Sequence, residues 1–117
     1  MPARIEVELD IFSGMPNPTW TLTDTEADSF TKQLAAASPT AAAELHGNLG
    51  YRGFIVQMTR GADTQAIRVQ NGTIHISQAA ASVYARDEDR KLEQWLLDTA
   101  RPYIKDELFQ MAKRELR

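Results

Sequence analysis

The 117-residue chain has no cysteine and only two histidines, and basic residues are not in excess. Without cysteine there can be no disulfide, no thiolate-bound metal site and no cysteine nucleophile. The 13 Lys and Arg against 16 Asp and Glu give a net charge of −3. This balance argues against a nucleic-acid partner, because non-specific binding neutralises phosphates with basic side chains. His46 and His75 have no metal-ligand spacing, so we expect no metal and no cofactor.

The chain also lacks long apolar segments. No stretch approaches the roughly 18 apolar residues of a membrane-spanning helix, and the N-terminus has no apolar run of the kind that secretory signals carry. We therefore expect no membrane partner and a cytoplasmic location. The composition, 43% hydrophobic and 25% charged, is that of a soluble globular protein, and the length suits a single domain over residues 1–117.

The alternation of apolar and polar residues predicts strands. Residues 4–12 alternate strictly, with β-branched residues at several of the apolar positions, which indicates a half-buried strand. Residues 19–22 repeat the pattern over a shorter length. Residues 54–58 form another apolar run that we interpret as a strand.

A hairpin is the most specific structural prediction. The pair Asn71–Gly72 is favoured in two-residue type I′ turns, and folding residues 65–77 at this pair matches apolar with apolar and polar with polar residues. A shift by one residue would destroy the match. The expected partners are Gln70 with Thr73, Val69 with Ile74, Arg68 with His75, and Ile67 with Ile76.

Helix signals lie between and after these strands. Thr23 and Glu26 have the spacing of a capping box and predict a helix over about 24–37. Ser38–Pro39 resembles the start of a second, short helix that would end near His46. Residues 78–85 are interpreted as a link.

The C-terminal part of the chain carries an amphipathic helical stripe. It begins near Asp87 and continues towards the C-terminus. Pro102 lies inside the stripe, and a proline within a helix removes a hydrogen bond and clashes with the preceding turn. We therefore expect the helix to kink or break there.

These elements predict an α+β fold in the order β-β-α-β-β-β-α. A mainly antiparallel sheet of about five strands, with helices packed on one face, buries all of the apolar faces. The strand alternation places apolar residues towards the helices: Ile5, Val7, Leu9, Ile11, Ile67, Val69, Ile74 and Ile76. It places polar residues on an outer face that can stay wet: Glu6, Glu8, Asp10, Arg68, Gln70, Thr73, His75 and Ser77.

The segment 13–20 is the first candidate site. Pro16 and Pro18 stiffen it, and a stiff segment loses little entropy on binding. Asp10, Ser13 and Asn17 offer oxygen atoms to a polar ligand, although a single carboxylate is too few for calcium. Trp20 serves either as an aromatic anchor of this site or as a core residue in a structural crossover.

The second candidate is His75, which the hairpin places beside Arg68. Histidine titrates near neutrality and acts as a base when a carboxylate orients it. The alternative is a polar cross-strand pair on a solvated sheet face.

Acidic residues are concentrated in the first half of the chain. Residues 1–50 hold two basic and seven acidic side chains, a charge of −5, and residues 51–117 hold 11 basic and nine acidic ones, a charge of +2. Several of the acids lie on the predicted outer face. They can meet basic residues of their own sheet or the basic C-terminal helix of a neighbouring molecule.

The absence of catalytic motifs favours a non-enzymatic binding or accessory domain. It would act through segment 13–20 and the polar outer face, on a protein partner, on a second copy of itself or on a small polar ligand. One alternative is a small cofactor-free enzyme in which Asp10 or His75 is the general base, Arg68 holds an anionic substrate and Trp20 walls the pocket. Another is an acidic inhibitor or immunity-type protein that covers a basic partner.

Overall fold

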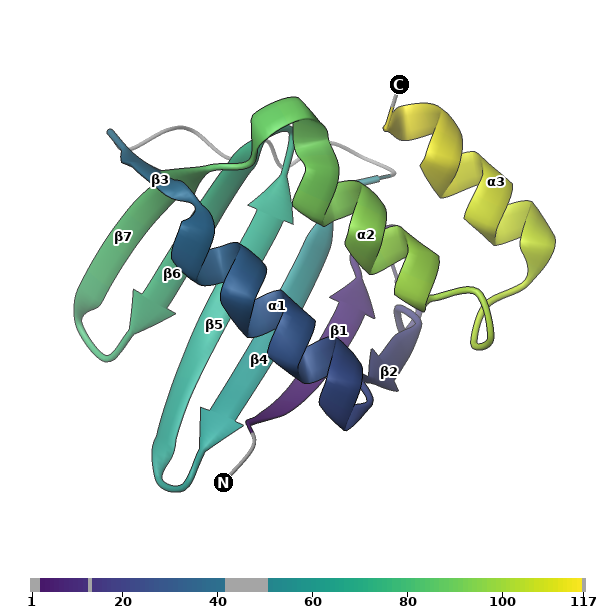
Figure 1. Cartoon of the computed structure of the whole chain (residues 1–117). Helices are drawn as coiled ribbons and strands as arrows, with labels where there is room; N and C mark the ends of the chain where they lie inside the picture. The colour runs from purple at the N-terminus through teal and green to yellow at the C-terminus, as the bar shows by residue number, and fades with distance from the viewer. Residues whose placement is uncertain (1–2, 13, 42–50, 117) are drawn as a thin grey trace.

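The computed structural model of the chain describes residues 3–12, 14–41 and 51–116, which form an antiparallel seven-stranded sheet with helices on one face (Figure 1). The strand order is β2-β1-β4-β5-β6-β7-β3. The strands are β1 (Arg4–Leu9), β2 (Thr19–Thr21), β3 (Ser38–Thr40), β4 (Phe54–Arg60), β5 (Asp63–Gln70), β6 (Thr73–Gln78) and β7 (Ala81–Arg86). The α+β class and the antiparallel sheet expected from the sequence are confirmed, with more strands than the five expected.

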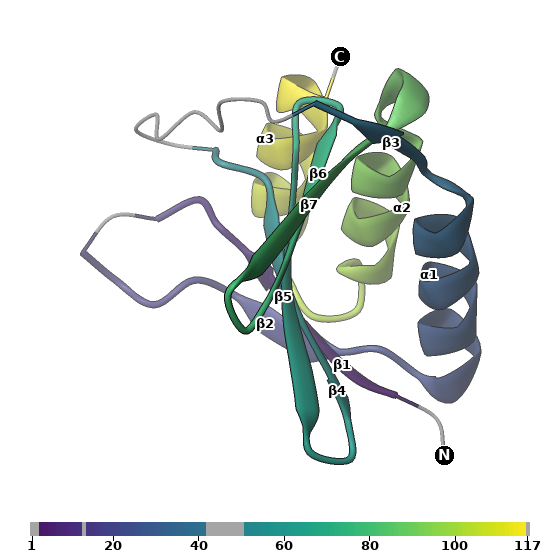
Figure 2. The same ribbon diagram turned by 90° about the vertical axis from the view of Figure 1, so that its left-hand side faces the viewer.

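The helices are α1 (Asp24–Ala36), α2 (Lys91–Thr99) and α3 (Asp106–Glu115), and a short 3-10 turn, η1 (Glu88–Arg90), precedes α2. Helices α1 and α2 cross the same face of the sheet, and α3 lies beyond α2 on the β1–β2 side (Figure 1). Seen along the sheet, the connection between β1 and β2 projects away from α1 and α2 (Figure 2). The molecule therefore has a helix-covered face and an outer face.

Local sequence signals set the predicted turns and caps. Thr23 and Glu26 form the capping box of α1, in which each side chain bonds the backbone of the other. The β5–β6 hairpin has the predicted register, from Gln70 opposite Thr73 to Ile67 opposite Ile76. Its turn residues Asn71 and Gly72 both have positive φ, 50° and 82°, as a type I′ turn requires.

The core lies between the sheet and the helices. The apolar residues expected to face the helices are buried, except Ile76, which is half-buried. Phe30 of α1, Phe54 of β4 and Leu96 of α2 are each fully buried among them. Burial of each such side chain contributes about 1.5–3 kcal/mol, so this face supplies most of the apolar stabilisation.

Two sequence interpretations are wrong. Ser38–Thr40 is not a helix start but strand β3, which pairs with β7 through Ser38 opposite Arg86 and Thr40 opposite Tyr84. The segment interpreted as a link is largely β7, paired with β6. In both cases pairing with a neighbouring strand overrides the local signal. The predicted end of the short helix at His46 lies outside the described residues.

The C-terminal stripe divides as Pro102 predicts. Helix α2 ends at Thr99 and α3 begins at Asp106, with turns between them. The buried residues Phe109 and Ala112 of α3 belong to the same hydrophobic core as Leu97 of α2. The break therefore lets one amphipathic sequence form two helices that share the core.

Candidate functional site

Asp10 directly follows β1 on the outer side of the sheet and is only 7% exposed. Its Oδ1 accepts hydrogen bonds from Nη2 and Nε of Arg52, at 2.8 and 3.1 Å. Its Oδ2 accepts from Nη1 of Arg68 at 3.1 Å. Of the two kinds of partner expected for the acidic outer face, Asp10 has the first: two guanidinium groups of its own molecule enclose the carboxylate.

The surroundings of Asp10 act on its pKa in opposite directions. Burial raises the pKa, but the hydrogen bonds and positive charges of Arg52 and Arg68 outweigh burial and hold the pKa below its ordinary value. Asp10 is therefore an ionised acceptor with both oxygens occupied. A general base needs a free lone pair directed at its substrate, and this geometry does not provide one.

Arg52 completes the site and was not identified from the sequence. It donates its backbone N–H to the Asp10 carbonyl at 2.7 Å, and Asp10 donates its own to the Gly53 carbonyl at 2.9 Å. Gly53 has φ +83°, and a Cβ there would collide with the Val69 carbonyl, so only glycine fits. Only the pairing of β1 with β4 reveals the role of Arg52, because it brings Arg52 next to Asp10, which lies 42 residues earlier in the chain.

Asn17 fastens the β1–β2 connection to the sheet. Its Oδ1 accepts the backbone N–H groups of Ile11 and Phe12 at 3.1 and 2.8 Å. Its Nδ2 donates to Oε2 of Glu8 at 2.8 Å and to Oδ1 of Asp10 at 3.3 Å. We call Asp10, Asn17, Arg52 and Arg68 the clamp. Ser13, another candidate of this segment, lies outside the described residues.

Trp20 does not join the clamp. It is 5% exposed and points from β2 into the core. Its Nε1 donates to the Thr99 hydroxyl at 2.9 Å, and its ring stacks on Tyr103 with centroids 6.4 Å apart. Of the two interpretations of Trp20, the structure supports the core residue.

His75 lies on the outer face of β6, opposite Arg68 in the neighbouring strand. Its ring stacks on Tyr84 of β7, with centroids 4.5 Å apart and an interplanar angle of 18°. A shallow hollow of about 200 Å³ lies beside His75 and Arg68 and is also lined by Ile55. Tyr84 was missed because β7 was not predicted as a strand.

A separate group of buried charges holds the start of α2. Glu93 is fully buried and accepts hydrogen bonds from Nε and Nη2 of Arg90, both at 3.0 Å, and from the Tyr51 hydroxyl. Burial, followed by the charge of Glu93, raises the pKa of Tyr51. Asp89 and Arg90 have φ values of 54° and 55°, a left-handed conformation that costs non-glycine residues free energy. The paired charges hold Arg90 in this conformation.

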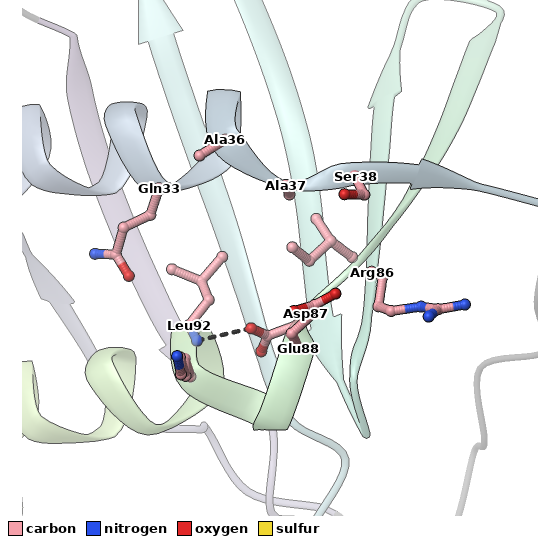
Figure 3. Close-up of a pocket in the computed structure, with 10 residues that line it drawn as sticks. Gln33, Ala36, Ala37, Ser38, Arg86, Asp87, Glu88 and Leu92 are labelled. Atoms are coloured by element: carbon pink, nitrogen blue, oxygen red, sulfur yellow. Dashed lines mark hydrogen bonds between the residues drawn. The ribbon is translucent and has the colours of Figure 1, made fainter.

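A hollow of about 360 Å³ lies between α1, β7 and α2. The Asp87 carboxylate is turned towards α2, where it accepts the backbone N–H groups of Leu92 and Glu93 at 2.8 and 3.0 Å. Figure 3 shows Arg86 pointing away from the other lining residues and Gln33 reaching down from α1. The polar groups do not converge on one point, as a ligand site requires, so we interpret the hollow as a seam between the two helices.

Comparison with models of protein families, with curated proteins and with solved structures finds no match to this chain. Within residues 3–12, 14–41 and 51–116, no group of three or more His, Asp and Glu is placed to hold a metal ion. None of the helices in the same ranges has the length and apolar character needed to cross a membrane.

Proposed function

We propose that this chain is a non-enzymatic binding domain that contacts a protein partner through the outer face and the β1–β2 connection. The observation that carries the proposal is the clamp. Asn17 and Arg52 each bond both Asp10 and the backbone or side chains of the connection, which fixes the connection against the sheet. A connection that is ordered before binding loses less conformational entropy when a partner arrives.

The outer face has the chemistry of a protein contact surface. The stacked rings of His75 and Tyr84 and the half-buried side chain of Ile55 provide apolar area. Gln57 and Ser77 add polar groups beside them. Aromatic side chains within a polar surround are typical of the residues that dominate binding energy at protein interfaces.

The clamp also argues against the two alternatives drawn from the sequence. The enzyme hypothesis needs Asp10 or His75 as the general base and Trp20 as a pocket wall. Asp10 is fully engaged and Trp20 lies in the core, so His75, which stacks on Tyr84, has neither of these residues beside it as a catalytic partner. The inhibitor hypothesis needs acidic side chains that face a basic partner. Glu8 and Asp10 instead face Asn17 and the arginines of their own chain.

The test uses the full chain as bait in a lysate of its source cells, with chemical crosslinking. His75→Ala and Tyr84→Ala remove the ring pair, and Lys32→Ala on α1 is the matched control, because Lys32 is exposed and pairs only with the exposed Asp28 among the described residues. We expect both ring variants to capture the crosslinked partner about tenfold less or worse and the control to capture it normally.

Capture that is equal for wild type, both ring variants and the control contradicts the proposal. The salt dependence of partner capture distinguishes the inhibitor hypothesis from the proposed binding domain. A contact based on rings and neutral polar groups loses little affinity with salt, whereas a contact of acidic with basic surfaces weakens steeply.

A further inference from the structure

An apolar groove of about 410 Å³ runs between the β1–β2 connection and α3. Phe12 and Pro18 form one wall, and Ile104, Leu108 and Met111 form the other. Tyr103, which also lines the groove, is 54% exposed, and Met111 is 45% exposed. Exposed apolar surface gathered in one groove is characteristic of a binding site.

The groove wall of α3 adjoins the side by which α3 packs into the core, because Ile104 and Leu108 are partly buried against the core. Phe109 and Ala112 face the core and are buried. Leu108 and Met111 are three residues apart in α3, which puts them on one helical face, and Ile104 lies in the turn before α3. The apolar surface of α3 thus continues from the core to the groove, where Met111 is exposed.

The two ends of α3 carry charges of opposite sign. The first turn of α3 holds Asp106 and Glu107, and its last turn holds Lys113 and Arg114. Glu107 and Arg114 are seven residues apart, two turns of helix, so they flank the same apolar stripe at opposite ends. An α3 that runs antiparallel to another α3 brings Glu107 of each against Arg114 of the other.

We propose that the groove is a homodimer interface in which the α3 helices of two copies of this chain pack antiparallel about a two-fold axis. Such an axis makes the interface self-complementary, because each surface patch meets its own copy. Leu108 and Met111 of one copy lie against those of the other, and the flexible Met111 side chain enters the groove formed with Phe12 and Pro18. Glu107 and Arg114 then form reciprocal ion pairs at both ends.

This inference goes beyond the proposed function, because it names a second copy as occupant of a surface other than the outer face. Neither His75 nor Tyr84 lines the groove. Loss of dimer and loss of partner capture are therefore separable results, and either proposal can fail while the other holds.

Sedimentation equilibrium of the full chain over a range of concentrations tests the dimer. We expect wild type to approach twice the monomer mass. Met111→Glu places a charge in the groove and should weaken dimerisation at least about tenfold. Gln110→Glu is the matched control, because it adds the same charge to an exposed neighbour that does not line the groove, and it should leave the dimer intact.

Charge reversal tests the antiparallel arrangement. Arg114→Glu alone and Glu107→Arg alone should each weaken the dimer, because each places like charges together at both ends. The double variant should restore it, since the pairing is reciprocal, and an equimolar mixture of the two single variants should form a heterodimer. A dimer restored in the double variant would also show that the single variants lose the dimer through charge repulsion and not through unfolding.

A chain that stays monomeric at every concentration overturns the inference. A dimer that Met111→Glu leaves as stable as Gln110→Glu also overturns it, because the dimer then uses another surface. A dimer weakened by Met111→Glu but not restored by the double reversal overturns the antiparallel arrangement.

Discussion

The two faces of the sheet are stabilised by different physical effects. The helix-covered face buries apolar side chains whose interactions are non-directional and roughly proportional to area. The outer face is held by the clamp, in which each hydrogen bond depends on the placement of particular atoms. The covered face tolerates apolar exchanges of similar volume, whereas the clamp tolerates few exchanges of any kind.

The largest expected effect lies on the covered face. Trp20→Ala removes a buried ring and its hydrogen bond to Thr99, and we expect a loss of about 3–5 kcal/mol in the free energy of unfolding. Urea denaturation measures the loss. Trp20→Phe, which keeps most of the apolar area, should cost less than half as much. A loss below about 1 kcal/mol for Trp20→Ala would contradict the assignment of Trp20 to the core.

The next effect is in the clamp. Asp10→Asn leaves the guanidinium groups of Arg52 and Arg68 together without their shared carboxylate. Because both arginines retain some contact with water, we expect a loss of about 2–3 kcal/mol in the free energy of unfolding, below the full cost of a buried unpaired charge. The control is Glu6→Gln, which breaks an exposed pair with Arg4 and should cost less than about 0.5 kcal/mol.

The pH dependence of the same variant sharpens this result. The folded state lowers the pKa of Asp10 below its ordinary 3.8, so its ion pairs stabilise the fold above about pH 4 and are lost as the pH falls through the folded pKa. The difference in the free energy of unfolding between wild type and Asp10→Asn should therefore become smaller below about pH 4. A difference that stays constant from pH 7 to pH 2 would show that the charge of Asp10 does not stabilise the fold.

The smallest effect concerns the β1–β2 connection. Asn17→Ala removes the acceptor for the N–H groups of Ile11 and Phe12, and we expect a loss of about 1–2 kcal/mol together with faster hydrogen exchange at these two amides. Asn17→Asp keeps the acceptor but adds a charge beside Glu8 and Asp10, so it should be at least as destabilising. Unchanged exchange at Ile11 and Phe12 in both variants would show that Asn17 does not hold the connection.

Features decided by neighbours in the sequence were predictable. The capping box at Thr23 and Glu26, the Asn71–Gly72 turn and the break at Pro102 each depend on backbone preferences within a few residues. The inward direction of Ile5, Val7 and Leu9 follows from the two-residue period of a strand. Strands β3 and β7 were missed because Ser38–Pro39 also suits a helix start and β7 is rich in small residues.

The clamp and the His75–Tyr84 ring pair were predictable only in part. Asp10, Asn17 and Arg68 were candidates on chemical grounds, but Arg52 and Tyr84 were not, because each acquires its role from a strand pairing. Arg52 lies 42 residues from Asp10, and Arg68 lies 58 residues from it. No local pattern specifies that these three side chains meet.

The sequence by itself determined the alternation that gives the sheet an apolar and a polar face, together with the turns and caps that need only adjacent residues. The tertiary structure alone decided where the acidic charges go: Asp10 is neutralised within its own sheet instead of facing a partner. The physical reason is that burial and ion pairing depend on which strands become neighbours, and that choice is made by the packing of the whole chain.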